Sequence, residues 1–195
     1  LFFVPQLKED ICLYPAWESH PFDTFSPHPD VIIARLEVLY RLLQRPGFIV
    51  ITTIEALMQK VIPQEVLIDR SIILRKGSSI ERNALETRLS QNGYTRVSTV
   101  EDRGPFEFRG GIFDVFPPLT QRPFRIEFLG DEVETLRHFD VGTQRSLEQR
   151  SLEQRSPDGA VSEINLMPVR EIIYTADSVV RAIGKVKDRA DENEV

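Results

Sequence analysis

Residues 94–128 constrain the fold of this chain more than any other stretch. Two runs of strand character, 111–116 and 124–128, flank a proline-rich connection. In the second run, apolar residues alternate with charged ones: Phe124, Arg125, Ile126, Glu127 and Phe128. A period of two is typical of a strand that is buried on one side only. The sequence therefore predicts a sheet with one face in a core and one polar face.

Neighbouring residues extend this sheet into a module. Gly130 and Asp131 have the composition of a hairpin turn, which predicts a return strand over 133–141. Upstream, the β-branched run at 70–75 is typical of a further strand.

A helix is expected between these strands. Ser78 followed by Glu81 matches a capping box, in which each side chain binds a free amide at the helix start. The helix is expected to end at Asn92-Gly93, where glycine suits a left-handed cap. Residues 67–162 together predict an α+β module built on antiparallel strands.

Strands and helices alternate in the first third of the chain, which is typical of an open α/β sheet. The expected elements are a strand at 11–14, a helix at 30–44, a buried strand at 48–53 and a helix at 55–61. Thr53 is in position to cap the second helix. Strand character returns over 164–174, before a short helix at 176–186. We therefore expect an α/β module made of residues 1–66 and 163–195, into which residues 67–162 are inserted.

Composition excludes several classes of function. A formal net charge of −6 argues against a clamp that binds DNA through its whole surface. Cys12 is the only cysteine, which precludes an internal disulfide and favours a cytoplasmic setting. No apolar run approaches the ~20 residues that span a membrane. The chain begins without methionine, which indicates a piece of a longer polypeptide.

Motifs for catalysis or cofactors are not evident. Nothing matches a glycine-rich loop that ends in Gly-Lys-Ser/Thr, and the three histidines lack metal-ligand spacing. The adjacent Ser19 and His20 lack an orienting group and an oxyanion site. Trp17, Phe22 and Phe25 suit either base stacking or the hydrophobic anchoring of an irregular loop, and we favour the latter. We expect no enzyme activity, no cofactor and no metal in this chain.

Charge is concentrated on the predicted sheet, where arginines alternate with carboxylates: Arg96, Arg103, Arg109, Arg125, Glu101, Asp102, Glu107 and Glu127. Such a face suits charge-assisted contact with another protein. The alternative is that these side chains pair with one another and only keep the sheet soluble. A five-residue tandem repeat at 145–156 is more simply interpreted as a lengthened surface loop than as a recognition helix.

Four collinear segments carry a resemblance that covers nearly the whole chain. They are YPAWESHPFDTFSPHPDVIIARLEVLYRLL, FIVITTIEALMQKVIP, RGGIFDVFPP and FRIEFLGDEVETLRHFD. In this order they resemble the N-terminal region of the bacterial transcription-repair coupling factors, which is similar to the excision-repair protein UvrB. The resemblance implies a helicase-like α/β domain of P-loop NTPase type, degenerate as an ATPase, with an inserted domain that binds UvrA.

The same resemblance implies a role in nucleotide excision repair. The intact factor would use ATP and magnesium in a motor elsewhere in its chain, translocate on DNA and bind stalled RNA polymerase. Within this chain, the inserted domain would recruit UvrA. The match to the UvrB pattern implies UvrA-binding roles for Arg96, Arg109, Arg125 and Glu127, with Phe106 and Phe108 as flanking apolar contacts.

Two departures from UvrB bear on this interpretation. The chain lacks the tyrosine-rich hairpin that threads damaged DNA in UvrB, and Glu107 stands where UvrB has a further arginine. The alternatives are a UvrB-type subunit that verifies damage and an interaction domain with an unrelated partner. A damage-verifying subunit would require ATP hydrolysis and the hairpin, whereas an unrelated partner would leave UvrA unbound.

Overall fold

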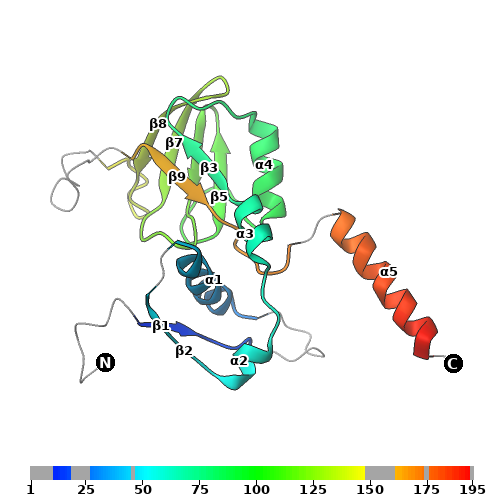
Figure 1. Cartoon of the computed structure of the whole chain (residues 1–195). Coiled ribbons are helices and arrows are strands. Elements are labelled where there is room, and N and C mark those ends of the chain that lie inside the picture. Colours follow the sequence, from blue (N-terminus) through cyan, green and yellow to red (C-terminus); the bar gives the residue numbers. More distant parts are fainter. Residues whose placement is uncertain (1–10, 19–26, 45–46, 148–160, 174–175, 194–195) are drawn as a thin grey trace, which may run out of the picture.

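A computed structural model describes residues 11–18, 27–44, 47–147, 161–173 and 176–193. The predicted aromatic anchors Phe22 and Phe25, the Ser19-His20 pair and most of the tandem repeat lie outside these residues. Figure 1 shows two layered parts and a helix that extends away from both. The elements in chain order are β1 (Ile11–Tyr14), α1 (Pro29–Gln44), β2 (Ile49–Thr52), α2 (Ile54–Met58), α3 (Gln64–Arg70), β3 (Ile72–Arg75), α4 (Arg82–Gln91), β4 (Thr95–Arg96), β5 (Pro105–Arg109), β6 (Ile112–Val115), β7 (Phe124–Leu129), β8 (Glu132–His138), β9 (Glu163–Leu166) and α5 (Ala176–Asn193).

The first part is a parallel strand pair with a helix on one face. β1 and β2 pair in parallel, and α1 connects them as the crossover that parallel pairing requires. The face toward α1 is buried around Cys12, Tyr14 and Val38. Thr53 caps α2 as expected, because its side chain accepts a hydrogen bond from the Ala56 amide. The predicted α/β order of residues 11–58 is therefore confirmed. The expectation that the strand at 48–53 is buried is wrong, because Ile49 and Ile51 are each 50% exposed.

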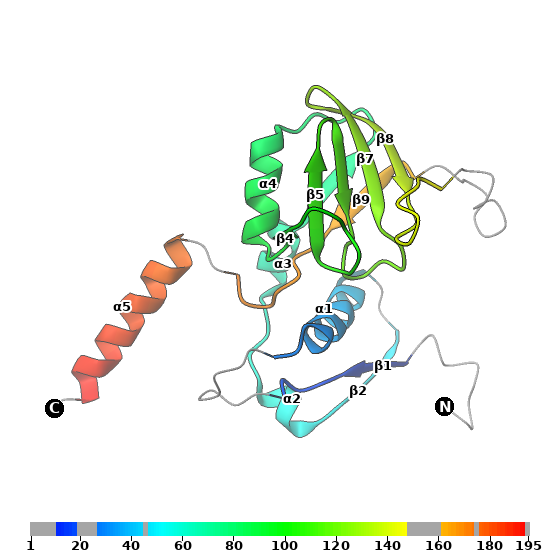
Figure 2. The same ribbon diagram turned by 180° about the vertical axis from the view of Figure 1, so that it is seen from behind.

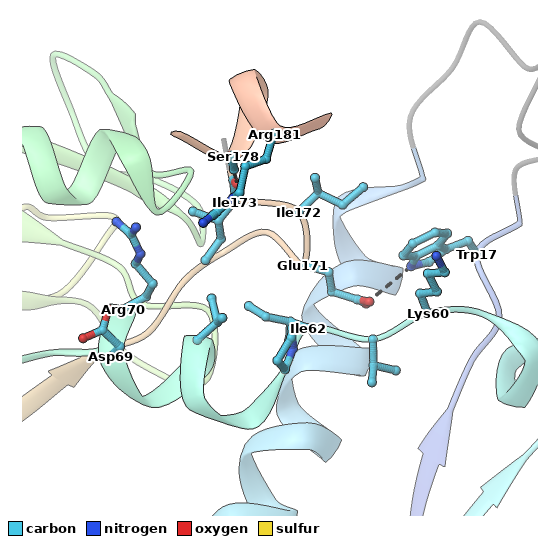
Figure 3. A pocket seen from close by; sticks show the side chains of 13 residues that line it. Trp17, Lys60, Ile62, Asp69, Arg70, Glu171, Ile172, Ile173, Ser178 and Arg181 are labelled. Atoms are coloured by element: carbon cyan, nitrogen blue, oxygen red, sulfur yellow. Dashed lines mark hydrogen bonds between the residues drawn. The ribbon is translucent and has the colours of Figure 1, made fainter. Parts of the chain in front are cut away.

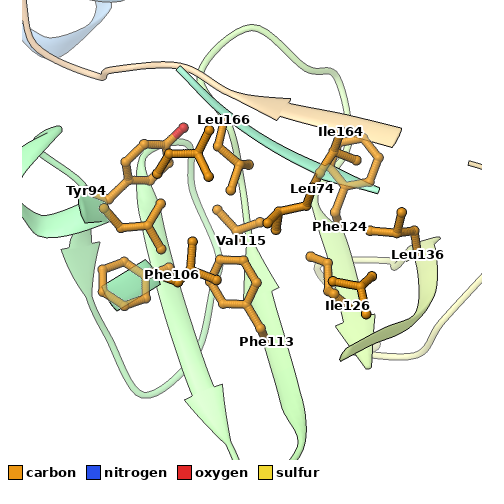
Figure 4. Close-up of a cluster of buried hydrophobic side chains, with 14 of the residues drawn as sticks. Leu74, Tyr94, Phe106, Phe113, Val115, Phe124, Ile126, Leu136, Ile164 and Leu166 are labelled. Carbon is orange, nitrogen blue, oxygen red and sulfur yellow. The ribbon is translucent and has the colours of Figure 1, made fainter. Parts of the chain in front are cut away.

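The second part is a five-stranded sheet in the order β4-β5-β6-β7-β8. Its pairs are antiparallel except for β4 and β5, which run in parallel. The sheet turns a phenylalanine-rich face to the core (Figure 4), and Phe106, Phe113 and Ile126 have no exposed surface. The predicted alternation in β7 holds for Phe124 and Ile126, but a bulge follows Glu127 and leaves Phe128 only partly buried.

Two layers cover that core face, and one of them crosses the predicted domain boundary. α4 contributes Leu85 and Leu89, while the antiparallel pair β3-β9 contributes Ile72, Leu74, Ile164 and Leu166. The sequence assigned residues 163–166 to the first module because strand character resumed there. That assignment is corrected here, since β9 pairs with β3 and buries its aliphatic residues in the core of the second part.

The start of α4 differs from the predicted capping box. The Ser78 hydroxyl donates to the Arg75 carbonyl in a preceding turn, at 2.6 Å. Glu81 is itself the cap, and its carboxylate accepts hydrogen bonds from the amides of Asn83 and Ala84 at 2.9 and 2.7 Å. The predicted end of the helix is confirmed by Gly93, whose φ is +93°.

Replacing Glu81 by alanine should therefore lower the free energy of unfolding by about 1 kcal/mol, because two helix amides lose their acceptor. The measurement is urea unfolding followed by far-UV circular dichroism. Glu101→Ala, at an exposed loop position, is the matched control. Equal midpoints for the two variants would contradict the capping role of Glu81.

A buried ion pair ties residues that are far apart in sequence to α1. Arg35 of α1 is fully buried, and its Nε and Nη2 donate to the Glu171 carboxylate at 2.5 and 3.2 Å. Its Nη1 donates to the Pro15 carbonyl and to Gln59 Oε1. The guanidinium also lies over the rings of Tyr14 and Trp17, at 4.3 and 5.0 Å from the ring centroids. One side chain thus connects β1, α1, the end of α2 and the segment after β9.

The last helix, α5, extends away from the remainder of the molecule in both Figure 1 and Figure 2. Val180 and Val186 on this helix are largely exposed. α5 is longer than the predicted helix at 176–186. Within the described ranges, no helix combines the length and the apolar character needed to cross a membrane.

Candidate protein-interaction site

The face of the five-stranded sheet opposite α4 carries four of the charged residues that the sequence analysis singled out: Glu107, Arg109, Arg125 and Glu127. Strand register places two rows of side chains across it. One row is Arg109, Ile112, Glu127 and Thr135, and the other is Glu107, Asp114, Arg125 and Arg137. We refer to these eight residues as the open face. Since neighbouring strands fix their spacing, the charged groups are held on a firm support.

Arg125 lies within this face but is not available to a partner. It is 9% exposed, and its Nε and Nη2 donate to the two carboxylate oxygens of Asp114 at 2.8 and 2.7 Å. Its Nη1 donates to the Gln144 carbonyl, and the guanidinium lies 4.9 Å from the Phe139 ring centroid. Hydrogen bonding to Asp114 raises the pKa of Arg125. The sequence-based assignment of Arg125 as a direct contact is corrected, because its donors are used internally.

Arg109 and Glu127 remain accessible on the open face. Arg109 is exposed, and its guanidinium forms no hydrogen bond or ion pair with any of the residues that the structure describes. The Glu127 carboxylate is partly exposed and accepts a hydrogen bond from the Thr135 hydroxyl at 2.8 Å. Its Oε2 is 3.7 Å from Nη2 of Arg137, which is half-exposed. The open face thus presents two cationic groups on either side of an oriented carboxylate.

Arg96 lies on the other side of the sheet. β4 places Arg96 in register with Phe106, whose side chain faces the core. The Arg96 guanidinium binds the Glu86 carboxylate of α4 at 2.6 Å. It is exposed, but it does not share a face with Arg109 and Glu127. The structure therefore separates Arg96 from the other three polar residues that the sequence analysis placed in one patch.

Phe106 and Phe108 belong to the core and not to a surface. Phe106 is fully buried and Phe108 is 8% exposed. Phe108 stacks on Phe113, with 4.6 Å between the ring centroids, and Arg82 covers its ring from α4. The predicted role of these rings as flanking contacts for a partner is corrected, because the alternation of β5 turns both into the interior.

Comparisons with known proteins place these observations in a family. Residues 72–157 match a family model described as the UvrB interaction domain. The chain is 38% identical over 155 residues to the transcription-repair-coupling factor of Escherichia coli (strain K12), which covers 80% of this chain and 12% of that protein. It is 36% identical to the factor of Haemophilus influenzae over 84% of this chain. It is 31% identical to the factor of Bacillus subtilis over 92% of this chain. The chain corresponds to a segment of the transcription-repair-coupling factors.

That segment is a small share of each coupling factor. The chain spans 12–14% of the length of these three relatives. The open face lies entirely within the matched UvrB interaction domain.

Sequence reasoning missed four residues of the open face in this coupling-factor segment: Ile112 and Asp114 on β6, and Thr135 and Arg137 on β8. The sequence predicted β8 as a return strand. Strict alternation along that strand, anchored on the buried Leu136, would have placed the two β8 residues beside Glu127 and Arg125.

Other candidate sites have structural roles in this coupling-factor segment. Trp17 packs against Arg35, and its indole Nε1 donates to Glu171 at 3.4 Å, which agrees with an anchor more than with a stacking platform. Asp131 in the turn before β8 and Glu132 at its start are both exposed to solvent. Across the described parts of the chain, no three His, Cys, Asp or Glu side chains cluster in a way that could hold a metal ion.

Proposed function

We propose that this chain is the UvrA-recruiting module of a transcription-repair coupling factor. The observation that carries the proposal is the pair of accessible, oppositely charged groups Arg109 and Glu127 on the open face of a matched UvrB interaction domain. Arg109 has its donors free among the described residues, while Thr135 orients the Glu127 carboxylate. The guanidinium on β5 and the carboxylate on β7 are held in one row of the sheet, with β6 between them. Such a fixed pair suits charge-assisted contact with a complementary protein surface.

In this proposal, the buried residues of the open face stabilise the sheet and do not touch UvrA themselves. Within the open face, Arg125 and Asp114 neutralise each other and hold β6 and β7 in register. Arg137 extends the accessible face onto β8. The contact set is therefore Arg109, Glu127 and Arg137, in place of the six residues inferred from the sequence.

Recruitment of UvrA is tested by co-elution. The chain, mixed with purified UvrA, should shift to the position of a complex in size-exclusion chromatography at moderate salt. The shift should weaken as salt increases, because exposed charges are screened. Failure to co-elute at low salt and micromolar concentration would contradict the proposal.

The remaining functions of a coupling factor are assigned to other parts of the longer protein. We propose that ATP-dependent translocation on DNA and contact with stalled RNA polymerase reside outside this chain. Residues 1–66 would then be part of a helicase-like α/β domain that has lost ATPase activity.

This division of functions predicts that the isolated chain neither hydrolyses ATP nor binds DNA tightly. The sequence has no phosphate-binding loop, and its net charge is −6. A coupled ATPase assay and fluorescence anisotropy with a labelled duplex are the measurements. Turnover above the buffer control, or a Kd below ~10⁻⁶ M at physiological salt, would show the prediction to be wrong.

A further inference from the structure

A cavity of about 620 Å³ lies between α3, the segment after β9 and the first two turns of α5. Figure 3 shows the side chains that line it, including Trp17 and Lys60 from earlier segments of the chain. Aliphatic side chains line the cavity, and Val61, Val66 and Ile172 keep a third or more of their surface exposed. Its volume falls within the range of ~300–1,000 Å³ that is usual for ligand pockets.

Cations surround this apolar space on three sides. Lys60, Arg70 and Arg181 line the cavity from the segment after α2, from α3 and from α5 respectively, and Figure 3 shows them apart from one another around it. Two carboxylates, those of Asp69 and Glu171, also line the cavity, and each has a cation near it. Asp69 lies next to Arg70, whereas the Glu171 carboxylate is held by the buried Arg35. The surroundings of the cavity therefore favour negative charge.

We propose that this cavity binds a partner protein through an apolar side chain flanked by carboxylates. The anchoring side chain would enter between Val66 and Ile172, and the flanking carboxylates would meet Lys60 and Arg181. An apolar anchor with a charged rim is the usual anatomy of a binding hot spot. The surface lies on other elements than the open face, so this interaction is separate from the proposed recruitment of UvrA.

The chain carries its own reporter for this interaction. Trp17 is the only tryptophan and lines the cavity, so a change in its fluorescence on binding arises at this site. The probes are two short blocked peptides, one of alternating leucine and glutamate and one of alternating leucine and lysine. We expect the glutamate peptide to give a saturable change in the fluorescence of the 195-residue chain, and the lysine peptide to bind at least tenfold more weakly.

Variants then locate the binding. Lys60→Glu and Arg181→Glu should each raise the Kd of the glutamate peptide by roughly fivefold, the upper range for one exposed charge pair. Lys187→Glu makes the same charge change on α5 at a position that does not line the cavity, and it should leave the Kd unchanged. Because Lys60 and Arg181 lie on different elements, a folding defect in one variant leaves the other informative.

Three outcomes would overturn the proposal. Equal affinity for the two peptides would show that charge plays no part, and equal effects of Arg181→Glu and Lys187→Glu would place the binding elsewhere. Sedimentation that reveals self-association of the chain, abolished by Arg181→Glu, would make a second copy the occupant in place of an acidic partner.

Discussion

Replacing Arg35 by alanine is expected to lower the free energy of unfolding by roughly 3–5 kcal/mol, the range for breaking a buried ion pair. The side chain has no exposed surface, and the Glu171 carboxylate that it binds is 3% exposed. Removing the guanidinium leaves that carboxylate buried without its partner. It also removes donors from the Pro15 carbonyl and from Gln59, so that three segments lose a common contact.

Urea unfolding of the variant and of two comparison variants measures this effect. Arg75→Ala breaks an ion pair with Glu163 in which both side chains are about half exposed, and it should cost at most about 1 kcal/mol. Arg35→Met combined with Glu171→Leu removes both charges and should restore most of the lost stability. A loss for Arg35→Ala as small as that for Arg75→Ala would show that the pair contributes little.

Replacing Arg109 by alanine is expected to weaken the binding of UvrA by roughly 2–4 kcal/mol, the range for truncating an arginine hot spot. Arg109 is accessible on the open face and is preorganised by the β5-β6 hairpin, so its donors can serve a partner. Isothermal titration of UvrA into the wild-type chain and the variant gives the difference. Glu127→Ala should act in the same direction, because Arg109 and Glu127 are in one row of the sheet.

The matched control for this titration is Arg88→Ala. Arg88 is exposed on α4, which covers the other face of the sheet. Its loss should change the affinity for UvrA by no more than about 0.5 kcal/mol, as is usual for surface substitutions away from a contact. Equal losses for Arg88→Ala and Arg109→Ala would indicate a general charge effect and not a defined surface.

The sequence predicted those helices and strands that a local pattern of residues identifies. β1 and α1 were placed within a residue or two, because a short apolar run and a helical stripe identify them without tertiary information. β5 was missed, although Gly110-Gly111 between two strand-like runs is a hairpin signal. A side chain at position 111 would lie 2.9 Å from the Phe128 carbonyl, which explains the glycine in this turn.

Long-range pairing could not be predicted from the sequence. Arg35 and Glu171 are separated by 136 residues, and nothing local to either indicates that both are buried. The pairing of β3 with β9 could not be predicted for the same reason. The two strands are far apart in the sequence, and nothing local to either one indicates its partner.

In the candidate site, too, local patterns predicted some features and long-range contacts determined the others. Alternation along β7 placed Arg125 and Glu127 on one face, which is correct, but it could not reveal that Asp114 of β6 occupies the Arg125 guanidinium. It also could not assign Arg96, because β4 joins the sheet in parallel and turns that residue toward α4. The accessible part of the surface therefore emerged only from the register of the strands.

Site-specific photo-crosslinking tests the central claim, that UvrA binds the open face, most directly. A benzophenone side chain is introduced at position 137, on the open face, or at position 88, on the helix that covers the opposite face. We expect irradiation of the complex to join UvrA to the chain from position 137 and not from position 88. Crosslinking from position 88 alone, or equally from both positions, would contradict the assignment of the UvrA-binding surface.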